Sequence, residues 1–154
     1  MKARRILLIA LAAASILGLS LAVGLRKTIT ISVEGQSRLV RTYALTVGGL
    51  LRLEDIPLGE QDSLEPPLNN WLKNHQTVKL VRAVPVQIWA DNQLVSFTSP
   101  QRLPELLLAE ASIALGPGDR LLSQGREWVF DQPFPEDSAG IAMQILRAVN
   151  FTLV

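Results

Sequence analysis

The sequence predicts an α+β protein in which an amino-terminal apolar helix precedes two small tandem domains. The chain has 154 residues, which is enough for one domain or for two small ones. A long run without charge near the amino terminus predicts the helix, and a strand, strand, helix, strand pattern that occurs twice predicts the domains. The predicted segments are 1–27, 28–83, 84–149 and 150–154.

Composition excludes several classes of function. Fifteen basic and fourteen acidic residues give a formal net charge of +1, so there is no strong field to attract a polyanion, and we expect no nucleic-acid partner. The chain contains no cysteine, which excludes disulfides, thiolate zinc sites and thiol catalysis. With 48% hydrophobic and 19% charged residues, the chain is not expected to be disordered.

The amino-terminal 27 residues have the pattern of a membrane-targeting segment. Three basic residues within 1–5 precede the charge-free run 6–25, and Arg26 and Lys27 follow it. A helix of that length is about 30 Å long, which matches the hydrocarbon core of a bilayer. It is either a transmembrane anchor or a signal peptide cleaved near Ala22. Both alternatives place the rest of the chain outside the cytoplasm, at the membrane or secreted.

The residues after the apolar run alternate between apolar and polar, which predicts a half-buried strand. A turn at Gly35 and Gln36 leads to a second strand, and Thr46 is placed to cap a short helix. Because Gly48 and Gly49 weaken that helix, packing must hold it. The expected elements are a strand within 28–35, a strand over 37–45, a helix over 47–55, a loop over 56–67, a short strand over 69–72 and a final strand over 76–83.

The second half of the chain repeats this pattern. Five residues recur 57 positions later, namely Ile56, Leu58, Gly59, Asp62 and Leu64 as Ile113, Leu115, Gly116, Asp119 and Leu121. The closing Arg-Ala-Val recurs at an offset of 65, so the second copy gains about eight residues, which fall in 125–140. Insertions between elements are typical of duplicated domains.

The repeated Gly-x-x-Asp has two interpretations. An aspartate three residues after a glycine can accept hydrogen bonds from backbone N–H groups and so stabilise a turn. The alternative is that Asp62 and Asp119 bind calcium, which needs six to eight oxygen ligands. Neither loop contains enough carboxylates for that, so we expect a turn-stabilising role.

The sequence contains no convincing catalytic or metal site. Glu105 and Glu110 lie five residues apart on a predicted helix, which puts them on different faces and argues against an acid/base pair. The single histidine, His75, has no second histidine or cysteine to share a metal and is expected at the surface. Glu136 and Asp137 lie in a proline-containing loop, where we expect them to be solvated. We therefore expect that the chain is not an enzyme and that it binds no cofactor and no metal.

The inserted segment contains three aromatic residues, Trp128, Phe130 and Phe134. They are candidates for binding a partner or the face of a glycan if they are exposed. The alternative is that they fold back over the core, which a domain of this size needs. The second interpretation is the favoured one.

The first copy has a characteristic set of residues, namely Gly35, Thr42, Thr46, Val47, Leu50, Leu51, Ile56, Leu58, Gly59, Asp62, Arg82 and Ala83. With these residues it resembles the DUF348 ubiquitin-like repeat, found in resuscitation-promoting factors and YabE-like cell-wall-binding proteins. The resemblance extends to residue 149 but is weaker in the second copy, where Asn92 replaces Gly35 and Arg102 replaces Thr46.

The resemblance implies a β-grasp fold for each copy. The chain would then be a transmembrane or signal helix followed by two tandem small β-grasp domains, with a further domain beginning at 150–154, where wall-associated proteins of this kind carry their enzyme. It implies no catalytic residue. We expect a non-catalytic extracytoplasmic spacer or cell-envelope interaction module, with the membrane as a partner through 6–25 and peptidoglycan or other envelope components as further candidates. A binding module that uses the aromatic insertion is the alternative.

Overall fold

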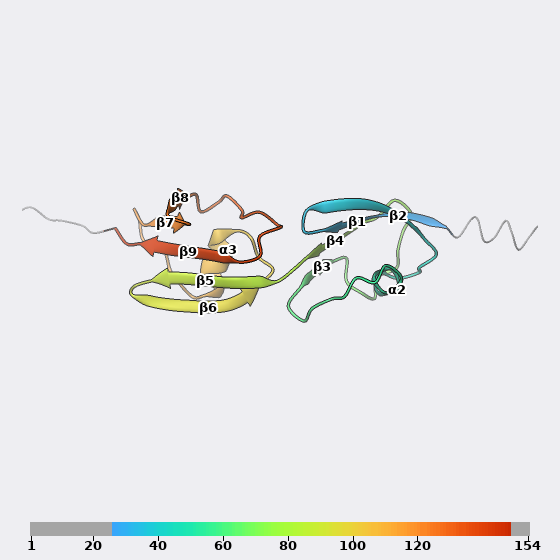
Figure 1. The fold of residues 1–154 in the computed structure, drawn as a ribbon, viewed down its shortest axis with the longest axis horizontal. Helices are drawn as coiled ribbons and strands as arrows, with labels where there is room; N and C mark the ends of the chain where they lie inside the picture. Colours follow the sequence, from blue (N-terminus) through green and yellow to red (C-terminus); the bar gives the residue numbers. More distant parts are fainter. Residues whose placement is uncertain (1–25, 149–154) are drawn as a thin grey trace, which may run out of the picture. The chain divides into compact units, whose positions relative to one another are not determined.

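The computed structural model describes residues 26–148 (Figure 1). The predicted membrane segment at 6–25 and the predicted start of a further domain at 150–154 lie outside this range. Within it, no helix has both the length and the apolar character needed to cross a membrane. The described chain divides into two compact units, with two sheets and two helices in total. This mixed, β-rich architecture agrees with the predicted α+β class and with ubiquitin-like domains.

The first sheet has four strands and one accompanying helix. The elements are β1 (Lys27–Val33), β2 (Gln36–Thr42), α2 (Val47–Leu53), β3 (Ser63–Glu65) and β4 (Thr77–Val81). The strand order is β2-β1-β4-β3. The N–H of Thr30 donates to the carbonyl of Gln76 at 3.0 Å, and the N–H of Glu34 donates to that of Leu80 at 3.4 Å. Because both pairs have the same sequence separation, the central strands β1 and β4 run parallel.

Helix α2 is held by its cap and by packing, as the sequence predicts. The side chain of Thr46 accepts a hydrogen bond from the N–H of Gly49 at 3.2 Å. Val47 and Leu50 are completely buried. The N–H of Gly48 donates to the carbonyl of Leu68 at 2.8 Å, and a Cβ on Gly48 would lie 3.2 Å from that oxygen. The glycine therefore permits a close approach of two backbone segments.

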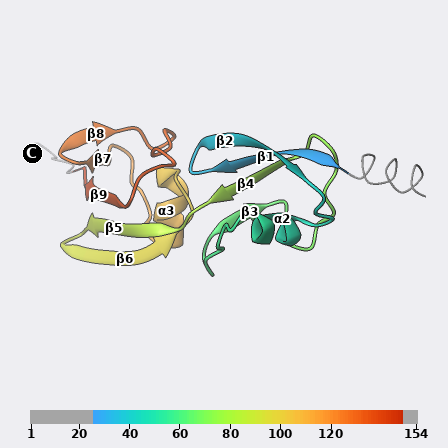
Figure 2. The same ribbon diagram turned by 45° about the vertical axis from the view of Figure 1, so that its right-hand side comes forward.

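The second sheet has five strands in the order β6-β5-β9-β7-β8. Its elements are β5 (Val84–Ala90), β6 (Gln93–Ser99), α3 (Pro104–Glu110), β7 (Arg120–Ser123), β8 (Arg126–Trp128) and β9 (Ile141–Leu146). Strands β5 and β9 are parallel, and the other pairs are antiparallel. Figure 2 shows α3 beside β5 and β9, where its Leu107 and Leu108 join the buried cluster of this sheet. The order of the first sheet recurs here, with β8 added at one edge.

Three hairpin turns share one backbone conformation. Both central residues have positive φ in the turns Glu34–Gly35 (51° and 80°), Asp91–Asn92 (51° and 61°) and Gln124–Gly125 (51° and 74°). Two consecutive positive φ values define the type I′ turn, which suits the twist of a two-residue hairpin. The predicted turn at Gly35 and Gln36 was therefore wrong by one residue. Asn92 can replace Gly35 because asparagine tolerates this conformation better than most residues.

Two elements of the first copy differ from the prediction. The predicted loop over 56–67 contains β3, which pairs with β4 from Ser63↔Val81 to Glu65↔Lys79. With three residues and a single inward apolar side chain, β3 has too little periodicity to be recognised. The short strand predicted at 69–72 is only an isolated bridge between Thr46 and Trp71.

The start of α3 differs from that of α2. Its N-cap position is Leu103, which makes no side-chain capping bond, and Pro104 occupies the first turn. Proline suits that position because its φ is already helical and its missing N–H would be unpaired there anyway. Arg102, which aligns with the capping threonine of the first copy, does not cap the helix, and its guanidinium donates to the carbonyl of Gln101 at 3.1 Å.

Replacing Thr46 by alanine should destabilise the first sheet and its helix by about 1 kcal/mol, since the N–H of Gly49 loses its acceptor. Urea unfolding monitored by circular dichroism measures this loss. Thr46→Ser is the control, because serine keeps the hydroxyl and should retain most of the stability. Equal losses in the two variants would show that the methyl group, and not the cap, is responsible.

Candidate functional site

A carboxylate closes the first sheet at the point where the chain leaves it. Asp62 accepts hydrogen bonds from the N–H of Gly59 at 2.9 Å and from the N–H of Ala83 at 2.9 Å. The guanidinium of Arg82 donates to the same carboxylate at 2.7 Å and also to the carbonyl of Pro57. We call this arrangement of Gly, Asp, Arg and Ala the clasp. It joins the loop before β3 to the residues that follow β4.

The second sheet has the same clasp. Asp119 accepts from the N–H of Gly116 at 2.8 Å, from the N–H of Ala148 at 2.9 Å and from Arg147 at 2.8 Å. Arg147 also forms two hydrogen bonds to Asp91, at 2.9 and 2.6 Å. The turn-stabilising role predicted for the two repeated aspartates is therefore confirmed. The repetition of Gly-x-x-Asp and of the closing Arg-Ala was predicted from the sequence, but the binding of one to the other was not.

The donors of the clasp lower the pKa of both carboxyl groups. For Asp119, the N–H groups of Ala148 and Gly116 together with Arg147 lower the pKa to about 2. For Asp62, burial raises the pKa, but the N–H groups of Ala83 and Gly59 and the charge of Arg82 outweigh it, and the pKa is lowered. Both carboxylates are thus ionised at neutral pH and already occupied by protein donors. Within residues 26–148 there is no cluster of three or more acidic or histidine side chains placed to bind a metal.

The three aromatic residues of the insertion lie against the core of the second sheet. Phe134 is 7% exposed and belongs to the buried cluster, while Trp128 and Phe130 are partly buried and pack against it. The rings of Trp128 and Phe134 stack with centroids 4.9 Å apart. Pairing of β8 with β7 places Trp128 opposite Leu121. The structure thus agrees with the core-covering interpretation and not with an exposed aromatic surface.

A cavity of about 210 Å³ lies beside these aromatic side chains. Trp128 and Phe134 contribute to its walls, and Ser123, Gln124 and Arg126 add polar groups. The indole N–H of Trp128 is not available to a ligand, because it donates to the carbonyl of Gln132 at 2.8 Å. The cavity is the place in the insertion where a small ligand would find both apolar and polar contacts.

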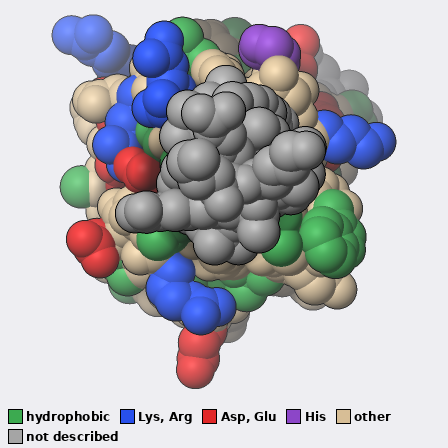
Figure 3. Space-filling model, turned by 90° about the vertical axis from the view of Figure 1, so that its right-hand side faces the viewer, with side chains coloured by type: hydrophobic (Ala, Val, Ile, Leu, Met, Phe, Trp, Pro, Cys, Tyr) green, Lys and Arg blue, Asp and Glu red, His purple; other side chains and the backbone are tan. Residues whose placement is uncertain are grey.

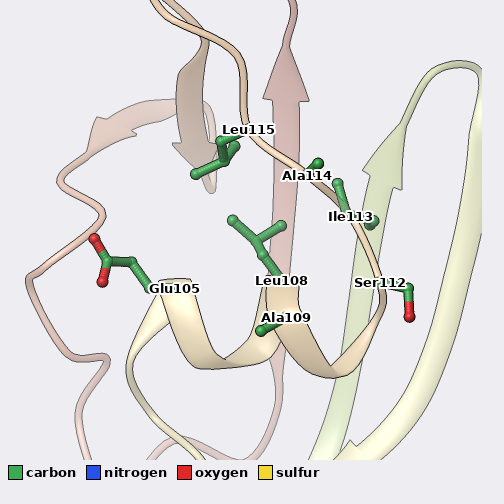
Figure 4. Close-up of a pocket in the computed structure, with 7 residues that line it drawn as sticks. All are labelled: Glu105, Leu108, Ala109, Ser112, Ile113, Ala114 and Leu115. Atoms are coloured by element: carbon green, nitrogen blue, oxygen red, sulfur yellow. The ribbon is translucent and has the colours of Figure 1, made fainter.

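A second, more open groove of about 430 Å³ lies along α3 and the loop that follows it (Figure 4). Leu108 points from the helix into the space below Leu115, while Glu105 lies at the left of the labelled group and Ser112 at the right. Glu110, the other carboxylate considered for catalysis, instead accepts a hydrogen bond from the hydroxyl of Ser99 at 2.7 Å. The two glutamates do not face a common site.

Two of the remaining candidates, His75 and Asp137, occupy surface positions. His75 is exposed with a φ of 60°, and its N–H donates to the carbonyl of Thr28 at 2.7 Å. Asp137 is exposed, as predicted. Glu136 differs from the prediction, because it is half-buried and accepts a hydrogen bond from the ammonium group of Lys79 at 2.5 Å. The predicted surface position of His75 is confirmed.

A group of exposed apolar side chains in the first unit was not predicted from the sequence. Tyr43, Leu45, Leu68 and Trp71 are 57%, 51%, 46% and 65% exposed. We call these four residues the aromatic rim. The available signal was a tryptophan in a loop rich in asparagine and proline, which is an unusual place for a core residue.

Residues 29–69 match the DUF348 family, described as a G5-linked-Ubiquitin-like domain. The match runs from β1 through β3 and confirms the resemblance noted in the sequence. No curated protein matches the chain. The assignment of the second copy to this family stays a prediction.

The clasp makes stability depend on pH in a defined window. The folded pKa of Asp119 is about 2, below its usual 3.8, so its contribution is complete above about pH 4 and is lost as the pH falls toward 2. Asp119→Asn should therefore lower the melting temperature at pH 6, and the difference from the natural protein should shrink as the pH falls from 4 to 2. A difference that stays constant over this range would contradict an ionised clasp.

Phe134→Ala should destabilise the second sheet by about 3–5 kcal/mol, the usual cost of removing a buried phenylalanine. Val129→Ala is the control, since Val129 lies in the same segment but is 58% exposed and should change the stability by less than about 0.5 kcal/mol. Chemical denaturation measures both. Unchanged stability in the Phe134 variant would favour a partner-binding role for the insertion.

Proposed function

We propose that the chain is a non-catalytic extracytoplasmic spacer of the cell envelope. In this proposal, residues 28–83 and 84–149 are two tandem β-grasp domains, and residues 6–25 hold them at the outer face of the membrane or direct their secretion. The observation that carries the proposal is the short connection between the two sheets. Strand β4 ends at Val81 and β5 begins at Val84.

The connection contains no free linker residue. Arg82 and Ala83 are both bound to Asp62 in the clasp of the first sheet. Val84 is already paired with Ser99 in the second sheet. Pro85 fixes one further backbone angle. A flexible linker would need glycine or serine residues outside both sheets, so this connection favours a spacer over two independently moving domains.

The strand order of each sheet also suits a spacer. In each sheet, the first strand along the chain lies beside the last strand and parallel to it. These pairs are β1 and β4 in the first sheet, and β5 and β9 in the second. The chain therefore enters a sheet at one end and leaves it at the other. Tension along the chain would act on all the hydrogen bonds between these two strands at once. A sheet with antiparallel terminal strands would instead lose its bonds one after another.

A second function is favoured by the cavity beside the insertion. Its volume of about 210 Å³ and its mixture of Trp128, Phe134 and Arg126 suit a small polar ligand with one apolar face. In this alternative the module binds a component of the envelope through residues 123–142. The stacking of Trp128 on Phe134 leaves less aromatic surface for such a ligand, so the spacer is the leading proposal.

Location tests the spacer proposal directly. The full chain with a carboxy-terminal tag, expressed in a bacterium, should appear in the membrane fraction, or in the medium if it is cleaved near Ala22. Protease added outside protoplasts should remove the tag from any membrane-bound protein. The variant that lacks residues 6–25 is the control and should keep its tag inside the cell. A protected tag on the full chain would contradict the proposal, and digestion of purified peptidoglycan by the protein would contradict the absence of catalysis.

A further inference from the structure

We propose that the aromatic rim of the first unit docks onto the lipid headgroup layer of the membrane from which the chain emerges. This inference rests on the proposed membrane tether and goes beyond it. It assigns an interaction surface to Tyr43, Leu45, Leu68 and Trp71.

Backbone pairing brings the four rim residues together. Trp71 lies on the segment that bridges Thr46, and the N–H of Leu72 donates to the carbonyl of Leu45 at 2.8 Å. The carbonyl of Leu68 accepts from the N–H of Gly48 at 2.8 Å. The rim is therefore formed by two segments, 43–48 and 68–72, that are hydrogen-bonded to each other.

The rim lies where the described chain begins. The ammonium group of Lys27 reaches the carbonyl of Ala44, between Tyr43 and Leu45, at 3.5 Å. The N–H of Thr28 donates to the side chain of Asn74 at 2.8 Å. Lys27 comes two residues after the charge-free run 6–25. If that run occupies the membrane, the start of β1 and the rim beside it are within a few residues of the headgroups.

The charges around the rim are complementary to an anionic lipid surface. The segments 26–33, 37–53 and 66–78 contain no aspartate or glutamate. Their basic residues are Arg26, Lys27, Arg38, Arg41, Arg52 and Lys73. Glu54 and Asp55 follow the second segment, and Glu54 neutralises Arg38 in an ion pair at 3.0 Å, so the other basic residues carry the attraction. Arg41 and Lys73 are exposed. In the sequence, Arg41 lies two residues from Tyr43, and Lys73 lies two residues from Trp71. Figure 3 shows basic and hydrophobic side chains on one face of the surface, with a few acidic side chains among them.

The fold of the first unit does not require these aromatic side chains. The buried side chains of its strands and helix are aliphatic, as in Ile29, Ile31 and Leu50. Tyr43 and Trp71 are more than half exposed. Tryptophan and tyrosine favour the membrane interface, where the ring meets acyl chains and the polar group stays hydrated. Basic residues add attraction to anionic headgroups.

Tryptophan fluorescence in the full chain tests this docking. Trp89→Phe with Trp128→Phe leaves Trp71 as the sole tryptophan, and Trp71→Phe with Trp128→Phe leaves Trp89, which is 44% exposed on the second sheet. Each protein is reconstituted into vesicles of brominated phosphatidylcholine with phosphatidylglycerol, and flotation shows whether it is anchored. We expect quenching and a blue shift of Trp71 but not of Trp89.

The outcomes separate docking from tethering. Protein that does not float with the vesicles would overturn the tether, and docking with it. Protein that floats while Trp71 stays unquenched would overturn docking alone. Shielding of Trp71 from iodide by isolated peptidoglycan, without quenching by lipid, would assign the rim to a glycan or protein partner instead.

Further variants test the chemistry of the rim. Leu45→Ser with Leu68→Ser should remove most of the quenching of Trp71, whereas Leu39→Ser should not, although Leu39 is 74% exposed. Arg41→Gln and Lys73→Gln should each lower the docking equilibrium about fivefold in anionic vesicles, and salt should have a similar effect on the natural protein. Quenching that is equal in anionic and neutral vesicles and insensitive to these changes would contradict docking.

Discussion

The clasp is the interaction on which the closure of each sheet depends. One carboxylate, from Asp62 or Asp119, binds the loop that crosses the end of the sheet and the two residues that follow the last strand. These side chains are only 7% and 5% exposed. A charge with so little contact with water is tolerated because an arginine and two backbone N–H groups satisfy it. The clasp therefore fixes the exit of the chain as well as the loop.

The two sheets use their aromatic residues differently, although they share strand order and clasp. In the second sheet, Trp128 and Phe134 of the segment 125–140 cover a core formed by residues such as Ile88 and Leu121. The first unit is smaller, and its core is filled by aliphatic residues alone. Tyr43 and Trp71 have no such role in the interior. Trp128 and Phe134 therefore contribute to the interior of the second sheet, whereas Tyr43 and Trp71 lie at the surface of the first unit.

Much of the fold could be predicted from the sequence, because the patterns that indicate its strands, its helix cap and its repeat are local. Alternation identified β1, the threonine before two glycines identified the cap of α2, and the constant offset of Gly-x-x-Asp identified the repeat. The binding of Asp62 to Arg82 could not be predicted, since a pairing across 20 residues depends on the fold. Strand β3 is defined by its pairing with β4 and not by its own composition.

The exposure of aromatic side chains also depends on contacts between distant parts of the chain, which the sequence does not reveal. Aromatic residues concentrated in one insertion gave a clear signal, but exposure depends on what lies opposite, and β8 places Trp128 against Leu121. Tyr43 and Trp71 are separated by about half of the first copy, and only the fold makes them neighbours. The aromatic residues that the sequence marks as binding candidates, such as Trp128, are therefore packed, whereas the exposed Tyr43 and Trp71 carry no comparable signal in the sequence.

The rim and the clasp together imply a direction for the chain. Strand β1 begins beside the rim at Lys27, and β4 runs parallel to it and ends near the clasp at Ala83. A seven-residue strand such as β1 spans about 23 Å. A first unit docked through its rim would therefore hold its exit on the side away from the lipid. Docking would give the spacer an orientation at the membrane that a flexible tether alone could not provide.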